Sequence, residues 1–330
     1  MKKVALIIKI VISITLIYIV ARRIDFSHFS EAWHKINIWY MLGAYILLII
    51  SMIVNSIKWW ELLKVQGIKK PLKNITSHYL VGYFFNNFLT GAGEVKRIYD
   101  LSKETGKSHG VVASVFMERW TGIICQVTMA VIALGWAYKE IPELHTVLIV
   151  CGSLFLILLV IFLIAGKVSY IPFIDRFKPL HQWLETFRES YDEYMKKPGA
   201  LVLAFALSLV PPIMLIFIHW LITLGLGYDV SLWVFVLFIP IISVFSQIPV
   251  SMNGIGVQEI LFVELFKMVG VPPQIAFSVS ILSHILKMAV GAIGGIIYLL
   301  RKEHGQLTQN EEDAKKSDVK VGKTGKVFES

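Results

Sequence analysis

The hydrophobic residues of this chain gather into long blocks, and the polar residues are concentrated in the shorter segments between them. Each block reaches or approaches the roughly 20 residues that a helix needs to cross about 30 Å of hydrocarbon. Soluble domains instead distribute their apolar residues in helical or alternating patterns. We therefore predict an all-α membrane fold with six full transmembrane helices, within residues 4–21, 38–57, 111–137, 147–165, 201–226 and 275–300.

Two further segments, 76–108 and 232–270, begin as apolar and aromatic stretches but are interrupted near the middle. Glycine-rich runs of this kind end helices, and in both segments a helical pattern resumes after the interruption. We therefore expect each segment to form two short helices joined by a turn. The residues predicted to form the turns are Gly91 and Gly93 in the first segment, and Pro249, Asn253, Gly254 and Gly256 in the second.

The distribution of charge predicts the orientation. The net charge of +9 is compatible with nucleic acid, but the basic residues lie in short loops, which favours the positive-inside rule as the explanation. Residues 58–74 contain five lysines and one glutamate and residues 167–200 six basic residues, whereas 138–145 and 226–231 contain one lysine and three acids between them. We expect a multi-pass protein of the cell (inner) membrane, with both termini cytoplasmic and no nucleic acid partner.

The charge of the flanking loops predicts that the two broken segments are re-entrant. Basic loops flank 76–108 on both sides, so it should enter and leave on the cytoplasmic face, whereas both flanks of 232–270 should lie outside. Each half, about 1–140 and about 141–300, then has two spans, a hairpin and a third span. Because three spans is an odd number, the halves form an inverted repeat, and paired glycine breaks mark the substrate site in many transporters of this design.

The final segment, 301–330, has seven basic and six acidic residues and few large apolar side chains. Such composition does not support a packed core. We expect a disordered, charged cytoplasmic tail after a membrane domain that spans residues 1–300.

Charged side chains at bilayer depth are costly and are therefore candidates for function. Glu118 and Arg119 either form a structural ion pair with a neighbouring helix or contact a substrate, and Lys96 either contacts a substrate or lies in cytoplasmic water. On the last span, His284 and Lys287 share a helix face with Gly291 and Gly294. This face either packs against another helix or lines a cavity. The predicted substrate-binding residues are Arg97, Lys287, Lys96, Glu118, Arg119 and His284.

Two acids begin the helices that follow the glycine breaks. Glu94 and Glu259 could cap these helices, because a carboxylate near a helix N-terminus is stabilised by the helix dipole. Either could instead carry a proton if burial disfavours its charged form. Capping is the simpler interpretation, and proton transport stays an alternative.

Several of these motifs resemble one family. They are Asn87, the run from Gly91 to Arg97 and Glu118-Arg119 in the first half, and Pro249-Val250-Ser251 with the run from Gly254 to Glu259 in the second. Over most of residues 1–300 the chain resembles the transmembrane region of lysylphosphatidylglycerol synthases and the related stand-alone flippase-like membrane proteins. It departs from the family at Leu89-Thr90, where a proline often precedes the glycines, and at His284, where an arginine is common.

The resemblance implies that the chain moves a polar lipid between leaflets. In the family, aminoacyl transfer belongs to a large soluble domain that follows the membrane region. The residues after Leu300 are too few for such a domain, so we expect no enzyme activity.

Three functions remain open: a lipid translocase, a transferase acting on lipid headgroups, and a transporter of ions or small solutes. The sequence has no metal-ligand cluster, P-loop or nucleophile motif, so we expect no metal and no cofactor. The expected partners are membrane lipids, and the sequence does not predict an oligomeric state.

Overall fold

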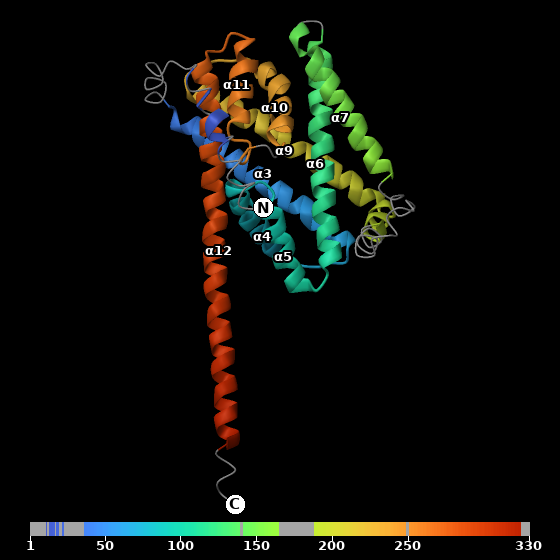
Figure 1. Cartoon of the computed structure of the whole chain (residues 1–330), viewed down its shortest axis with the longest axis vertical. Coiled ribbons are helices and arrows are strands. Elements are labelled where there is room, and N and C mark those ends of the chain that lie inside the picture. Colours follow the sequence, from blue (N-terminus) through green and yellow to red (C-terminus); the bar gives the residue numbers. More distant parts are fainter. Residues whose placement is uncertain are drawn as a thin grey trace, which may run out of the picture.

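The computed structural model describes residues 36–138, 141–164, 188–248 and 251–324, together with residues 11, 13–16, 18, 19 and 22 near the N-terminus. The predicted first span and Pro249 therefore lie largely or wholly outside the described residues. Within the described part, the regular structure is helical and contains no strand. Its fully described elements are α3 Ile38–Val65, α4 Leu72–Phe88, α5 Ala92–Thr105, α6 Ser108–Ala137, the short η1 Pro142–Leu144, α7 His145–Ile164, α9 Pro198–Gly225, α10 Leu232–Ser246, α11 Val257–Lys267 and α12 Pro273–Thr324 (Figure 1). Residues 188–195 are helical as well.

Among the described residues, four stretches are long and apolar enough to cross a membrane, namely α3, α6, α9 and the Pro273–Arg301 part of α12. A shorter apolar stretch, His145–Ile161, lies in α7. The predicted blocks from residue 38 onward lie within these five helices, except that residue 226 follows the end of α9 and residue 165 lies outside the described residues. An all-helical membrane protein is thus confirmed by length and composition.

Two pairs of short helices occupy the predicted broken segments. The α4 helix has 17 residues and α5 has 14, and α10 and α11 have 15 and 11. At 1.5 Å per residue, even the longest of these covers only about 25 Å, less than the hydrocarbon thickness. The predicted helix breaks are therefore confirmed, with Gly91 (φ 87°) preceding α5 and Gly256 (φ 92°) preceding α11.

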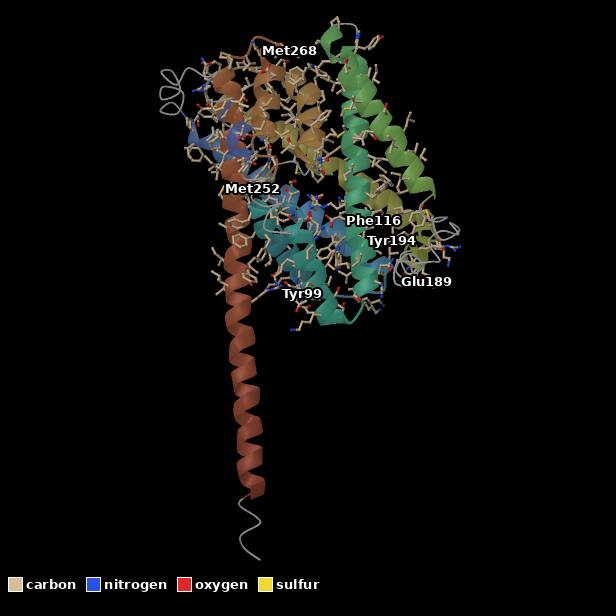
Figure 2. The ribbon with its side chains drawn as sticks, in the orientation of Figure 1. Tyr99, Phe116, Glu189, Tyr194, Met252 and Met268 are labelled. Atoms are coloured by element: carbon tan, nitrogen blue, oxygen red, sulfur yellow. The ribbon has the colours of Figure 1, made fainter. Side chains whose placement is uncertain are left out.

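The two short pairs lie at different ends of the bundle. In Figure 1, α4 and α5 lie in the lower half of the helical body, whereas α10 and α11 lie in the upper half. Met252, in the second break, lies between these levels, with Met268 above it and Tyr99 below (Figure 2). The turn of the second pair is thus directed towards the middle of the body.

Helix packing joins the two halves of the chain. The longest interface is formed by α3 and α9, and α4 packs against α12 while α10 packs against α6. Glycines permit the α4–α12 contact, because a Cβ at Gly294 would collide with the Leu80 carbonyl oxygen and one at Gly291 with the Asn87 side chain. The predicted small-residue seam on the last span is therefore present, and its neighbour is α4.

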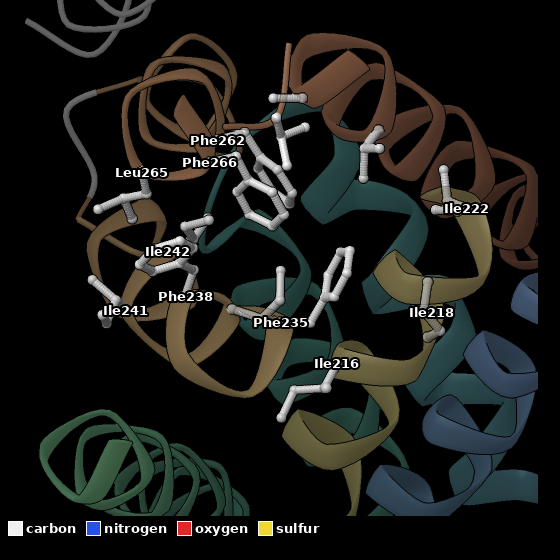
Figure 3. Close-up of a cluster of buried hydrophobic side chains, with 14 of the residues drawn as sticks. Ile216, Ile218, Ile222, Phe235, Phe238, Ile241, Ile242, Phe262, Leu265 and Phe266 are labelled. Carbon is white, nitrogen blue, oxygen red and sulfur yellow. The ribbon is translucent and has the colours of Figure 1, made fainter. Parts of the chain in front are cut away.

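The main hydrophobic core takes most of its residues from the second half and is completed by residues of α3 and α6. It contains a group of aromatic rings from α10 and α11, in which Phe262 and Phe266 stack with centroids 5.2 Å apart and Phe235 and Phe238 pack against Phe266 (Figure 3). Isoleucines of α9 close this core on one side. The second hairpin is therefore held by dense apolar packing.

The α12 helix extends beyond its membrane-length stretch to Thr324. The disordered tail that the composition predicts stays a prediction. The segment contains no proline, and its glutamate, glutamine, lysine and alanine residues favour helix.

Candidate substrate cavity

A cavity of about 550 Å³ lies among α3, α4, α5, α6 and α9, and both glycine breaks reach it. Its lining includes Gly91 and Gly93 of the first break and Asn253 of the second. Its other polar and charged lining residues are Asn55, Lys58, Tyr79, Asn86, Thr90, Glu94, Arg97, Glu118, Arg119, Gln126, Ser208, Ser246 and Gln247. A polar cavity of this size inside a membrane-spanning bundle is a candidate ligand site.

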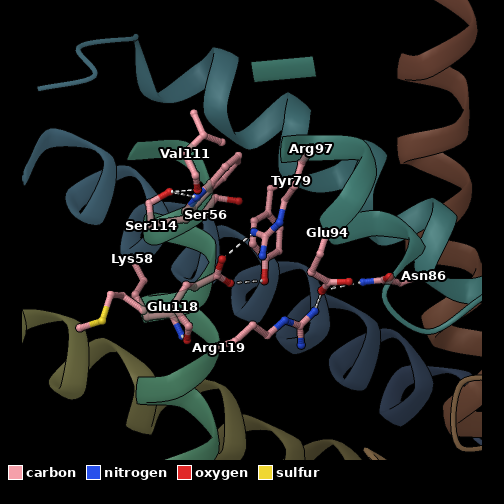
Figure 4. Close-up of polar contacts among 12 residues, drawn as sticks. Ser56, Lys58, Tyr79, Asn86, Glu94, Arg97, Val111, Ser114, Glu118 and Arg119 are labelled. Carbon is pink, nitrogen blue, oxygen red and sulfur yellow. Dashed lines mark hydrogen bonds and ion pairs between the residues drawn. The ribbon is translucent and has the colours of Figure 1, made fainter. Parts of the chain in front are cut away.

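Two ion pairs join α5 to α6 at the wall of the cavity (Figure 4). Arg97 Nη1 lies 2.6 Å from Glu118 Oε2, and Arg119 pairs with Glu94. Glu118 and Arg119 therefore have partners on the neighbouring helix, as one of the two interpretations of the sequence predicts. Both pairs also face the cavity, so contact with a substrate stays a prediction.

Arg97 and Lys58 are the two buried bases of the cavity. The Arg97 side chain is 3% exposed, and its guanidinium carbon lies 4.7 Å from the Trp59 ring centroid and 4.9 Å from that of Tyr79. The Tyr79 hydroxyl donates to Glu118 Oε1 at 3.1 Å. Arg97 Nη2 is buried and has no hydrogen-bond partner among the described residues. This leaves a donor that an acceptor in the cavity would satisfy.

Lys58 is a cavity residue that the sequence analysis missed. It was assigned to a cytoplasmic loop, but α3 continues to Val65, and Lys58 is buried. Its Nζ donates to the Glu118 carbonyl oxygen and to Ser208 Oγ, each at 3.2 Å. Trp59, Leu62 and Leu63 after it continue the helical spacing of apolar residues, and this signal could have extended the helix.

Asn86 was missed as well, and it fixes the first turn. Its side-chain oxygen accepts the Gly93 N–H at 2.8 Å, and its amide nitrogen donates to Glu94 Oε1 at 3.1 Å. The arms of this hairpin cross closely, because a Cβ at Gly93 would collide with the backbone of Gly82. No local sequence signal distinguishes Asn86 from the adjacent Asn87.

The two breaks touch each other at the cavity. The Asn253 N–H donates to Thr90 Oγ1 at 3.1 Å, and Gln247 at the end of α10 contacts Gln126 of α6. Asn253 has a positive φ of 49°, a conformation that asparagine tolerates better than most residues. Of the predicted turn residues, Gly91, Gly93 and Asn253 thus line the same cavity, whereas Gly254 and Gly256 do not, and Pro249 lies outside the described residues.

The remaining predicted site residues lie elsewhere. His284 Nε2 is 3.1 Å from Glu259 Oε1, and Lys287 Nζ donates to Gln258 Oε1 at 3.1 Å, in a cluster that does not line the cavity. Lys96 pairs with Asp100 at 2.7 Å, also away from the lining. The structure therefore brings Arg97, Glu118, Arg119 and Glu94 together and places Lys287 and His284 in a separate group.

The described residues hold no group of three or more histidine, cysteine, aspartate or glutamate side chains arranged for a metal ion. The expectation that the chain uses no metal and no cofactor stays a prediction.

The fold and the cavity define a polytopic helical membrane protein with charged residues inside the bundle. Residues 6–295 match the family described as the lysylphosphatidylglycerol synthase TM region, and the chain belongs to that family. A UPF0104 membrane protein of Methanocaldococcus jannaschii is 27% identical over 319 residues, which cover 89% of this chain and 94% of the relative. A UPF0104 membrane protein of Pyrococcus horikoshii is 24% identical over 326 residues, with 89% and 96% covered. No solved structure matches the chain.

Proposed function

We propose that this chain is a lipid translocase, which moves a lipid with a polar headgroup between the leaflets of the cytoplasmic membrane without modifying it. The headgroup would be that of an anionic phospholipid, an aminoacyl-phospholipid or a polyprenyl-linked glycolipid. The observation that carries the proposal is the charged cavity at the meeting point of the two glycine breaks. Membership of a family named for lipid synthesis is consistent with a lipid as the cargo.

The charges of the cavity favour an anionic headgroup. Its lining has three bases, Lys58, Arg97 and Arg119, and two acids, Glu94 and Glu118. The acids are paired with the two arginines, which leaves the charge of Lys58 without a carboxylate of its own and Arg97 with a free donor on Nη2. A phosphate oxygen would accept from both bases, and charge-assisted hydrogen bonds of this kind are strong in a poorly hydrated site.

An inverted repeat of six spans and two re-entrant hairpins is part of the proposal, and local contacts that recur after about half the chain support it. The Trp60 indole donates to the Lys70 carbonyl oxygen at 2.8 Å, and the Trp220 indole donates to that of Val230 at 3.2 Å. Gly67 and Gly227, the corresponding loop glycines, both have positive φ values.

The packing between halves repeats in the same way. The contact of α4 with α12 corresponds to that of α10 with α6, and α3 and α9 are the corresponding second spans. Inverted repeats place the substrate between the two halves and allow one half to move against the other.

A sided lipid-labelling assay in proteoliposomes tests the function. The purified full chain is reconstituted with NBD-labelled phosphatidylglycerol, and in parallel with labelled phosphatidylcholine. Dithionite is added outside the vesicles, and the loss of NBD fluorescence reports how fast lipid from the inner leaflet reaches the outer leaflet. We expect the anionic lipid to move faster than in vesicles without protein, and faster than the zwitterionic one.

The alternatives give different results in the same vesicles. A headgroup transferase would change the mass of the recovered lipid, and an ion transporter would pass ions without moving the label. Absence of accelerated flipping for phosphatidylglycerol, its aminoacyl derivatives and a polyprenyl-phosphate sugar would overturn the proposal.

A further inference from the structure

The cluster around Glu259 occupies the position in the second half that an ion pair of the cavity occupies in the first. Glu94 is the third residue of α5, after the capping Gly91, and Glu259 is the third residue of α11, after Gly256. Their basic partners also correspond, since Arg119 and His284 each stand eleven residues after the first residue of α6 and α12. The two acid–base pairs are therefore equivalent by position and contact.

The two pairs differ in chemistry and in burial. Arg119 is 47% exposed in the pair that lines the cavity, whereas Glu259 and His284 are 0% and 9% exposed. An arginine stays protonated in proteins, so the first pair keeps fixed charges. A histidine gains and releases a proton near neutral pH, so the second pair is able to change its charge.

Hydrogen bonds connect this pair to a second base. Glu259 Oε1 accepts from Ser280 Oγ at 3.0 Å, and Ser280 Oγ accepts from Gln258 Nε2 at 3.0 Å. Gln258 in turn accepts from Lys287 Nζ through its oxygen. The cluster thus contains one acid and two bases joined by polar side chains inside an apolar environment.

The surrounding elements add one more titratable group. His219 of α9 faces the cluster and lies against the Phe262 ring, with centroids 5.1 Å apart. The α10 helix has no titratable residue over Leu232–Ser246, and the other charged residues of α11, Glu264 and Lys267, lie on its later turns. Glu259, His284, Lys287 and His219 are therefore the titratable groups at this cluster.

We propose that Glu259 and His284 form a proton-binding site that couples lipid movement to the transmembrane proton gradient; this inference rests on the proposed function. A proton from the water on one side binds to the pair, and it is released to the water on the other side when the halves have moved. The lipid itself gains and loses no bond in this cycle.

The second break provides the connection between the proton site and the cavity. Glu259 Oε2 accepts the Gly256 N–H at 2.5 Å, while Asn253, three residues earlier, contacts Thr90 at the cavity. A proton on His284 gives the Glu259 carboxylate a cationic partner at Oε1, and charge-assisted contacts of this kind are the stronger ones. The carboxylate is then drawn towards His284 and away from the Gly256 N–H, which loosens the first turn of α11 and, through residues 253–256, the contact between the two breaks.

The first test measures coupling in proteoliposomes that hold the full chain and NBD-labelled phosphatidylglycerol, with the membrane potential clamped by potassium and valinomycin. With one proton per lipid, a gradient of about one pH unit should shift the steady-state leaflet ratio about tenfold. His284→Arg copies the fixed charge of the first half, so it should still equilibrate the lipid but hold the ratio near unity. The exposed His109 lies outside both sites, and His109→Gln should behave as the parent. If the parent protein flips lipid but gives the same leaflet ratio with and without the pH gradient, the inference is overturned and the proposed function is left intact.

The second test does not need transport. Histidine resonances of the ¹⁵N-histidine-labelled full chain are followed in nanodiscs, with His284 assigned from His284→Arg. We expect the His284 resonances to change with pH, and this titration to change in Glu259→Gln, which removes the carboxylate beside the ring. A His284 signal that does not titrate, or that ignores Glu259→Gln, would refute the proton site. The expected titration in a protein that moves no lipid would remove the lipid function and keep the proton site.

Discussion

Arg97 shows how one buried charge is made tolerable inside the bundle. Its guanidinium lies against the rings of Trp59 and Tyr79, and Glu118 neutralises it at 2.6 Å. Cation–π contacts and a close carboxylate offset the cost of removing the charge from water. The remaining unsatisfied donor on Nη2 is then the part of the side chain that is available to a ligand.

Neutralising Arg97 should affect folding and transport separately. Arg97→Gln leaves Glu118 buried without its partner, which we expect to cost about 3–5 kcal/mol of stability. The double variant Arg97→Gln with Glu118→Gln removes both charges and should recover most of this loss. Its initial flip rate per monodisperse molecule should nevertheless stay more than about tenfold below the parent, since a charge-assisted hydrogen bond contributes roughly 1.5–3 kcal/mol.

Arg97→Lys keeps the charge without the planar fork, so its rate should fall between those of the parent and the double variant. The exposed Lys103 on the same helix serves as the control, and Lys103→Gln should flip lipid at the parent rate. Thermal unfolding in detergent and flip rates from the same preparation separate the two effects. A double variant that folds and transports like the parent would exclude Arg97 from the headgroup site.

At the level of elements, the helices and their breaks could be predicted from the sequence, because glycine and apolar periodicity act locally. Gly91 and Gly256 needed only the chain around them to be recognised. The pairing of Arg97 with Glu118 could not be predicted, since it depends on how α5 packs against α6. Lys58 was assigned to a loop for a related reason. A charged residue after an apolar block suggests the end of the helix, and the burial of Lys58 between helices is known only from the structure.

The close crossing of α4 and α5 gives a test of the first hairpin. Gly93→Val places a side chain where the Gly82 backbone lies, so the two arms must separate, at a cost of about 1–3 kcal/mol. We expect the protein to be expressed and recovered from membranes but to lose lipid flipping. Gly256→Val should have the same effect, because its Cβ would lie 2.7 Å from Leu16 Cβ at a positive φ.

Gly135 is the matched control for these substitutions. It lies within α6 with no atom within 4 Å of an added Cβ, and Gly135→Ala should stabilise the helix by up to about 1 kcal/mol without changing transport. The measurement is the flip rate per folded molecule, beside the melting temperature. Parent rates in both Gly93→Val and Gly256→Val would mean that the breaks are incidental to transport.

At the level of the whole molecule, equivalent positions of the two halves in the proposed inverted repeat hold different residues. The sixth residue of α5 is Arg97, and the sixth residue of α11 is Phe262, which lies in the aromatic core. Glu118 of α6 likewise corresponds to Ser283 of α12. The first half thus supplies the charged wall of the cavity, and the second half supplies a packed body with one buried acid–base pair. In the proposed mechanism, the first half binds the headgroup and the second half responds to protonation.

The orientation of the molecule gives the last prediction. The loops after α3 and α5 lie together, since Lys107 Nζ donates to the Gly67 carbonyl oxygen at 3.1 Å, while the start of α3 lies at the other end, where the Asn37 N–H donates to Gly225. Residues 64–73 and 103–107 should therefore share the cytoplasmic face, and residues 140–145 and 228–231 should lie outside.

Single cysteines at Lys69, Lys103, Pro142 and Asp229, in a background with Cys125 and Cys151 replaced by alanine, test this orientation with a membrane-impermeant maleimide on intact cells. We expect labelling at Pro142→Cys and Asp229→Cys only, and labelling at the other two after the cells are opened. Because α4 and α5 together would otherwise cross the membrane, external labelling of Lys103→Cys with Lys69→Cys protected would refute the re-entrant hairpin and, with it, the inverted repeat.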